Sequence, residues 1–188
     1  RNIIRELAAR VAEIASMPVQ KQKRAMWRRL NGLKPDRPMV LIDQVCWNEM
    51  NVEDELTLRC EDPGCRGYEG YLRRTLYQWK HFPVDMVVEP FIRVPMAIVN
   101  TRFGIDIHEN VAITDPTNDI VGHKYLNQFE TDEDLENILM PVVSHDTAET
   151  DRRLSVAHEL FDGLLEVRPH GADLNLSLWD LIAQWMGV

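Results

Sequence analysis

The stretch PVDMVVEPF at residues 83–91 decides the predicted fold, because it holds a short apolar run that ends in a charged residue and a proline. The run at residues 86–88 does not alternate polar and apolar side chains, which is typical of a strand buried on both faces of a parallel sheet. Two similar runs occur at residues 39–42 (MVLI) and 164–168 (LLEVR). The sequence therefore predicts three buried parallel strands.

Helical patterns lie between and before these runs. Residues 66–81 and 132–162 carry apolar side chains three and four positions apart, and Pro141 is expected to break the second pattern into two helices. Residues 2–16 and 19–31 predict two further helices, the second ended by Gly32. Strands that alternate with helices in this way are typical of right-handed parallel β/α units.

Residues 98–125 do not follow that alternation. The stretches 105–113 and 119–125 predict two short strands joined by a turn at 115–118. We interpret them as a β-hairpin inserted on a loop after the second buried strand.

Composition excludes several classes of protein. The 188 residues include 30 acidic and 21 basic side chains, a net charge of −9 that argues against a nucleic-acid binder. No stretch approaches the roughly 20 apolar residues that cross a bilayer. Three cysteines and no visible secretory signal indicate the cytoplasm. Of the five tryptophans, those at 27, 79, 179 and 185 fall in helical patterns and are expected in the core.

Polar side chains gather where each apolar run ends, and in β/α folds the active site lies beyond that end of the strands. The predicted site residues are Gln44, Trp47, Asn48, Glu89, Arg93, Arg168 and His170.

Glu89 is the carboxylate most suited to catalysis, since it follows a buried run and is expected to have a cationic partner in Arg93 or Arg168. A structural ion pair is the alternative. His170 is a candidate general acid, metal ligand or pocket wall. Trp47 is a candidate to stack on a flat ligand.

A metal site made wholly of this chain is not predicted. Cys60 and Cys65 are four residues apart within CEDPGC, and no second pair of ligands matches them. The sequence also lacks the glycine-rich, nucleophile-elbow and zinc-peptidase signatures of several enzyme classes.

The order of these segments resembles the uroporphyrinogen decarboxylase superfamily, and within it the cobalamin-dependent methyltransferase branch. The segments that carry the resemblance are RRLNGLKPDRPMVLID (28–43), PVDMVVEPF (83–91), FGIDIHEN (103–110) and LLEVRPHGADLNL (164–176). It implies an α/β fold, a partial (β/α)8 TIM-type barrel with N-terminal helices. Residues 1–188 would form one domain, the N-terminal portion of the barrel, with helices over 1–33 and the first β/α units over 34–188.

The resemblance also implies a function, the transfer of a methyl group between a small substrate and cobalamin. Glu89 would orient or protonate the substrate, while Gln44 and Asn48 would hydrogen-bond it. A zinc ion would have its ligands outside this chain. The implied partners are a small-molecule substrate, a corrinoid protein, and either an oligomer or the missing C-terminal half.

Two alternatives remain open. The decarboxylases carry an arginine-rich motif where residues 43–49 here hold no arginine, which argues against a porphyrinogen with many carboxylates. A decarboxylase with an atypical site is nevertheless one alternative. The other is a non-catalytic partner or assembly subunit that completes a barrel with another chain.

Overall fold

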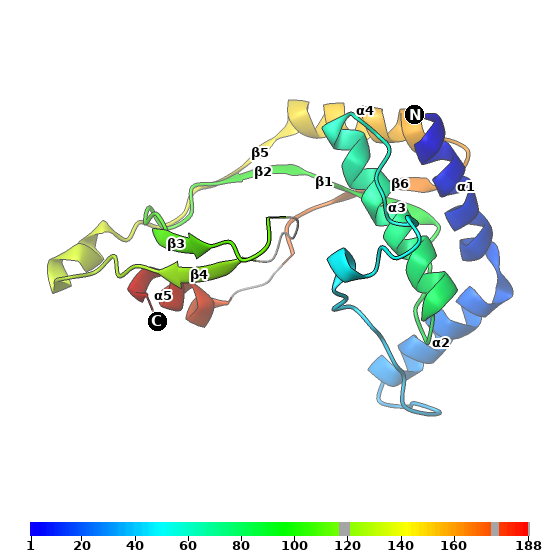
Figure 1. Cartoon of the computed structure of the whole chain (residues 1–188), viewed down its shortest axis with the longest axis horizontal. Helices are drawn as coiled ribbons and strands as arrows, with labels where there is room; N and C mark the ends of the chain where they lie inside the picture. The colour runs from blue at the N-terminus through cyan, green and yellow to red at the C-terminus, as the bar shows by residue number, and fades with distance from the viewer. Residues whose placement is uncertain (117–120, 174–176, 188) are drawn as a thin grey trace. The chain divides into compact units, whose positions relative to one another are not determined.

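The computed structural model describes residues 1–116, 121–173 and 177–187 and divides the chain into two compact units (Figure 1). Unit 1 comprises Arg1–Val94 and Arg152–Pro169, and unit 2 comprises Pro95–Asp151 and His170–Val188. Both helices and small sheets occur, so the chain is a mixed α/β protein.

Unit 1 contains the helices that the apolar spacing predicted. They are α1 (Asn2–Ser16), α2 (Pro18–Asn31), α3 (Pro63–His81) and the C-terminal part of α4 (Thr147–Phe161). The buried residues of α1 repeat every three or four positions, from Ile4 to Ala15, and this face packs along α3. The predictions of helices at 2–16, 19–31 and 66–81 are therefore confirmed.

Polar contacts define the ends of two of these helices. Asp62 is the N-cap of α3 and accepts a hydrogen bond from the backbone N–H of Cys65 at 2.8 Å. Pro63 follows it as the first residue of the helix. Arg5 of α1 donates to the carbonyl oxygens of Leu160 at 3.1 Å and Asp162 at 3.2 Å. The cation therefore satisfies carbonyl groups at the C-terminal end of α4.

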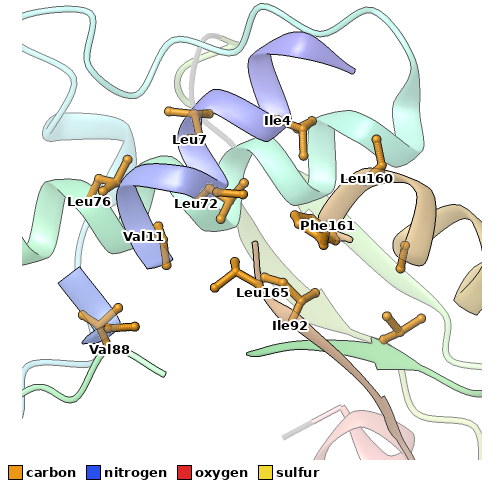
Figure 2. Packing of buried hydrophobic residues seen from close by; sticks show 14 of the residues in the cluster. Ile4, Leu7, Val11, Leu72, Leu76, Val88, Ile92, Leu160, Phe161 and Leu165 are labelled. Atoms are coloured by element: carbon orange, nitrogen blue, oxygen red, sulfur yellow. The ribbon is translucent and has the colours of Figure 1, made fainter. Parts of the chain in front are cut away.

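Two strands of unit 1, β1 (Phe91–Pro95) and β6 (Glu166–His170), form a two-stranded sheet. The N–H of Glu166, the first residue of β6, donates to the carbonyl of Pro90, directly before β1, at 3.0 Å. Because the two strands start at the same end, they run parallel. Ile92 and Val94 on one face of β1 are buried in the core that α1, α3 and α4 share (Figure 2).

The first two apolar runs are not strands, and this prediction was wrong. Residues 39–42 have no regular structure, and Val40 and Leu41 are half exposed. The N–H and the carbonyl of Val40 both pair with Asp85, and the carbonyl of Ile42 accepts a hydrogen bond from the side chain of Gln78. These backbone groups therefore form no ladder of hydrogen bonds with a neighbouring strand. Residues 86–88 are also irregular, although Met86 and Val88 are buried. The strand instead begins at Phe91.

Unit 2 contains two antiparallel pairs. The strands β2 (Ala97–Asn100) and β5 (Val143–Asp146) form one pair, and β3 (Glu109–Ala112) and β4 (Gly122–Tyr125) form the other. The second pair confirms the predicted hairpin strands, which are shorter than expected. Of the predicted turn, residues 117 and 118 lie outside the described residues.

The predicted helices over 132–162 are only partly correct. Residues 147–161 form α4, whereas Asp132–Asn137 form a single stretch of 3₁₀ helix and residues 143–146 form β5. Asp134 accepts hydrogen bonds from the N–H groups of Glu130 and Thr131 at 2.9 Å each, which caps this short element. Pro141 then removes a donor that a continuous helix would need.

The largest buried side chain of unit 2 is Trp185 on α5 (Leu178–Met186). Its ring meets Phe103 and Phe129 edge to face, with ring centroids 5.7 and 6.0 Å apart. Trp179 on the same helix is 78% exposed, so its predicted place in the core was wrong.

The described sheets have two strands each, and no closed barrel is present in the described part of the chain. Among the described helices, none combines the length and the apolar character that crossing a bilayer requires.

Candidate functional site

The exposed face of the β1–β6 pair carries mainly charged side chains. We name this face, together with Glu89 just before β1, the charged face. Its members are Glu89, Phe91, Arg93, Glu166 and Arg168. Side chains alternate along a strand, so Phe91 and Arg93 point away from the core that buries Ile92 and Val94. The parallel pairing places Glu166 and Arg168 beside them.

Two guanidinium groups lie near one aromatic ring on this face. The Cζ atom of Arg168 is 4.0 Å from the centroid of Phe91, and that of Arg93 is 5.9 Å away. Arg168 also makes a two-point ion pair with Glu166, at 2.5 and 2.8 Å. Arg93 is exposed and makes no hydrogen bond or ion pair with the described residues.

Glu89 has a cationic partner, but it is neither of the two that the sequence suggested. Arg24 of α2 donates from Nε to the Glu89 carboxylate at 3.1 Å, and both side chains are about one-third exposed. Glu166 raises the pKa of Arg168 above its ordinary value, with a smaller contribution from Glu89. Glu89, Arg93 and Arg168 are thus brought to one face, with Arg24 beside them.

The polar residues after the first apolar run lie elsewhere in unit 1. Trp47 begins the 3₁₀ helix Trp47–Glu49, and its ring contacts Tyr77 of α3 edge to face at 6.2 Å. The Cζ atom of Arg74, also on α3, lies 5.4 Å from the centroid of the Trp47 ring. Gln44 and Asn48 are exposed in this segment. Trp47 therefore lies along α3.

His170 belongs to unit 2. Its Nε2 atom is 3.2 Å from the carboxylate of Asp173, which is 81% exposed. Its carbonyl accepts the N–H of Met96 at 2.8 Å. The imidazole is thus paired with a solvent-exposed carboxylate, and its proposed role in catalysis stays a prediction.

Sequence reasoning missed the part that α2 plays in positioning the charged face. Gln20, Arg24 and Trp27 are spaced by four and three residues, which places them on one side of the helix. All three contact the segment before β1: Gln20 accepts from the N–H of Val88, Arg24 binds Glu89, and Trp27 donates to the carbonyl of Asp85. This spacing was the signal that could have linked α2 to the site.

Two buried carboxylates hold loops in place rather than facing solvent. Burial alone would raise the pKa of Glu69, but hydrogen bonds from the backbones of Cys60 and Arg59 and from Arg73 lower it to about 2. Bonds from Arg37 and from the N–H of Val40 lower the pKa of Asp85 to about 2. Both groups are therefore charged at neutral pH.

A metal site needs several His, Cys, Asp or Glu side chains close together. No cluster of three or more occurs in the described residues. Burial raises the pKa of the Cys60 and Cys65 thiols, with smaller contributions from the nearby carboxylates Glu69 and Asp62. Three pockets of unit 1, of 190, 260 and 440 Å³, are lined by residues other than the predicted site residues.

Comparison with known proteins found no family model, no curated protein and no solved structure that matches the chain.

Proposed function

We propose that the chain is a portion of a barrel enzyme of the uroporphyrinogen decarboxylase superfamily, and that the charged face lines its substrate-binding side. The supporting observation is the two-faced β1–β6 pair, which is parallel, covered by helices on one face and charged on the other. A barrel of the TIM type likewise has parallel strands with helices on their outer face and the other face turned inward.

Within that superfamily the proposed reaction is corrinoid-dependent methyl transfer. The proposal depends on the sequence resemblance and on the absence of arginine from residues 43–49. No step is assigned to zinc or to the corrinoid, because the resemblance puts the zinc ligands outside this chain, and no cluster of three or more metal-ligating side chains occurs in the described residues.

The residues of this chain would bind and orient the substrate. The ring of Phe91 offers a flat apolar surface, and Arg93 offers donors that no described residue occupies. Glu89, held by Arg24 at 3.1 Å, would accept a hydrogen bond or a proton from the bound molecule.

One observation favours a decarboxylase as a second candidate. Arg93 and Arg168 both lie over Phe91, within 6 Å of the ring centroid. Arg168 is already paired with Glu166, so Arg93 is the guanidinium that would bind a carboxylate of a flat substrate stacked on the ring. Arg93 would then partly offset the lack of arginine after the first apolar run.

Equilibrium titration of the chain with methylcobalamin, and separately with uroporphyrin, tests these proposals through ligand absorbance. We expect saturable binding of methylcobalamin, weakened about 10-fold by Phe91→Ala because the ring contributes apolar contact area. Arg28→Gln, on an exposed part of α2, is the matched control and should leave binding unchanged.

The other outcomes separate the candidates. Binding of uroporphyrin instead, lost in Arg93→Gln, would favour the decarboxylase. If the wild-type chain binds neither compound, the assignment of the charged face to substrate binding is wrong.

A further inference from the structure

We propose that a pocket between α1, α3 and the segment before α3 binds a small molecule carrying a phosphate or carboxylate group. The pocket has a volume of 190 Å³ and is lined by Ile3, Glu6, Leu7, Arg10, Arg59 and Arg73. A neighbouring pocket of 260 Å³ shares Leu7, Arg10 and Arg73 with it. Neither includes a residue of the charged face, so this site is independent of the proposed function.

Cations outnumber carboxylates in the lining. Three arginines face the smaller pocket, and Glu6 is the one acid among its lining residues. Arg73 is committed to protein partners, because it donates to the Glu69 carboxylate at 2.7 Å and to the carbonyl of Glu55 at 3.1 Å. The surplus positive charge therefore resides on Arg10 and Arg59.

Arg10 and Arg59 have unused donors. Neither guanidinium makes a hydrogen bond or ion pair with any residue that the structure describes. Glu6 lies one turn before Arg10 on α1, and even this neighbouring pair forms no ion pair. Guanidinium groups bind carboxylate and phosphate through paired N–H donors, so two of them on one pocket provide a site for an oxyanion.

The two arginines are held in place by the fold. The buried carboxylate of Glu69 accepts the backbone N–H of Arg59 at 2.9 Å from each oxygen, and this fixes the segment against α3. Arg10 is positioned by the packing of α1 along α3. Residues 49 positions apart in the sequence therefore reach one pocket without rearrangement.

The size and floor of the pocket limit the ligand. Ile3 and Leu7 supply apolar contact, and 190 Å³ is below the range of about 300–1,000 Å³ that accommodates drug-sized molecules. We therefore expect a compact anion, such as a small phosphorylated or dicarboxylated metabolite.

Titration calorimetry of the chain with inorganic phosphate and with malonate, at constant ionic strength, tests the site. At least one anion should bind saturably at a single site. Arg10→Gln and Arg59→Gln should each weaken binding about 10-fold, because each removes charge-assisted hydrogen bonds. The arm that binds more tightly identifies the anion class.

Two controls distinguish the pocket from general attraction of anions. Arg28→Gln makes the same change of charge elsewhere in unit 1 and should have no effect, while Glu6→Gln removes a competing carboxylate and should strengthen binding. Absence of binding by the wild type, or equal weakening by Arg10→Gln and Arg28→Gln, would overturn the proposal.

Discussion

The two units of this chain differ in how they use their apolar residues. Unit 1 contains a cluster of 16 buried hydrophobic residues, drawn from α1, α3, α4, β1 and the segments beside them (Figure 2). In the described part of unit 2, only Ala97 and Trp185 are buried hydrophobic residues. Large side chains such as Leu139, Met140 and Trp179 are more than 60% exposed there.

The two units also differ in their balance of basic and acidic residues. Unit 1 has 19 basic and 16 acidic residues, whereas unit 2 has 2 basic and 14 acidic residues. The net charge of −9 is therefore the sum of a slightly basic unit 1 and a strongly acidic unit 2, which would attract different partners. The difference also implies that stability comes mainly from unit 1, because burial of apolar surface is the dominant favourable contribution to folding.

The largest expected difference comes from making one substitution in each unit. Leu72→Ala, at a fully buried position of α3, should lower the free energy of unfolding by about 2–5 kcal/mol, because it leaves a cavity. Leu139→Ala, at a position 61% exposed in unit 2, should change it by less than about 0.5 kcal/mol. Urea unfolding followed by circular dichroism measures both. Equal losses of unfolding free energy in the two variants would show that the two units do not differ in how much their apolar residues stabilise them.

Acid should destabilise unit 1 through its buried carboxylates Glu69 and Asp85, of which Glu69 has the larger pKa shift. The folded pKa of Glu69 is about 2 and its ordinary value is 4.5, so its stabilisation is complete above pH 4.5 and is lost as the pH falls towards 2. The loss should reach about 3 kcal/mol, measured as urea midpoints between pH 7 and pH 2.

Two variants test the origin of this acid sensitivity. Glu69→Gln should reduce the pH dependence without removing it, because Asp85 also has a folded pKa of about 2. Glu166→Gln, which removes an exposed carboxylate, should leave it almost unchanged. A wild-type midpoint that does not fall with pH would show that Glu69 is not responsible.

The smallest expected effects come from replacing a glycine with alanine at one position in each unit, with opposite effects on stability. Gly187 has a φ of +71°, and a Cβ there would lie 2.8 Å from the carbonyl oxygen of Tyr125. Gly187→Ala should therefore cost about 1–2 kcal/mol. Gly67, inside α3 with nothing within 4 Å of an added Cβ, should gain about 0.5–1 kcal/mol as alanine.

Hydrogen exchange distinguishes where each glycine acts. The N–H of Gln128, which donates to the carbonyl of Trp185 at 2.7 Å, should exchange faster in Gly187→Ala and at the wild-type rate in Gly67→Ala. A stabilising Gly187→Ala would contradict the close approach of α5 to residues 125–127.

Much of unit 1 could be predicted because its helices carry local signals. Apolar spacing predicted α1, α2 and α3, and the Asp62–Pro63 cap marks the start of α3. The parallel pairing of the third predicted strand was also correct, with its partner displaced from 86–88 to Phe91–Pro95. That displacement could not be predicted, because an apolar run of three residues is buried equally well as a strand or as irregular chain.

The candidate site was predicted only in part. Glu89, Arg93 and Arg168 share one face, but the partner of Glu89 is Arg24, from a helix 65 residues earlier in the chain. Trp47 follows a predicted strand that does not form, and it lies along α3 instead. Positions derived from strand ends fail wherever the strand itself is absent.

The sequence alone determined which segments become helices in unit 1 and where the hairpin strands of unit 2 lie, since period, caps and turn residues act within a few positions. Only the tertiary structure decided which apolar runs pair into a sheet, which cation meets Glu89, and which arginines of α1 and the segment before α3 share a pocket. Those outcomes depend on contacts between distant residues, whose hydrogen-bond partners and burial are settled only when the whole unit packs.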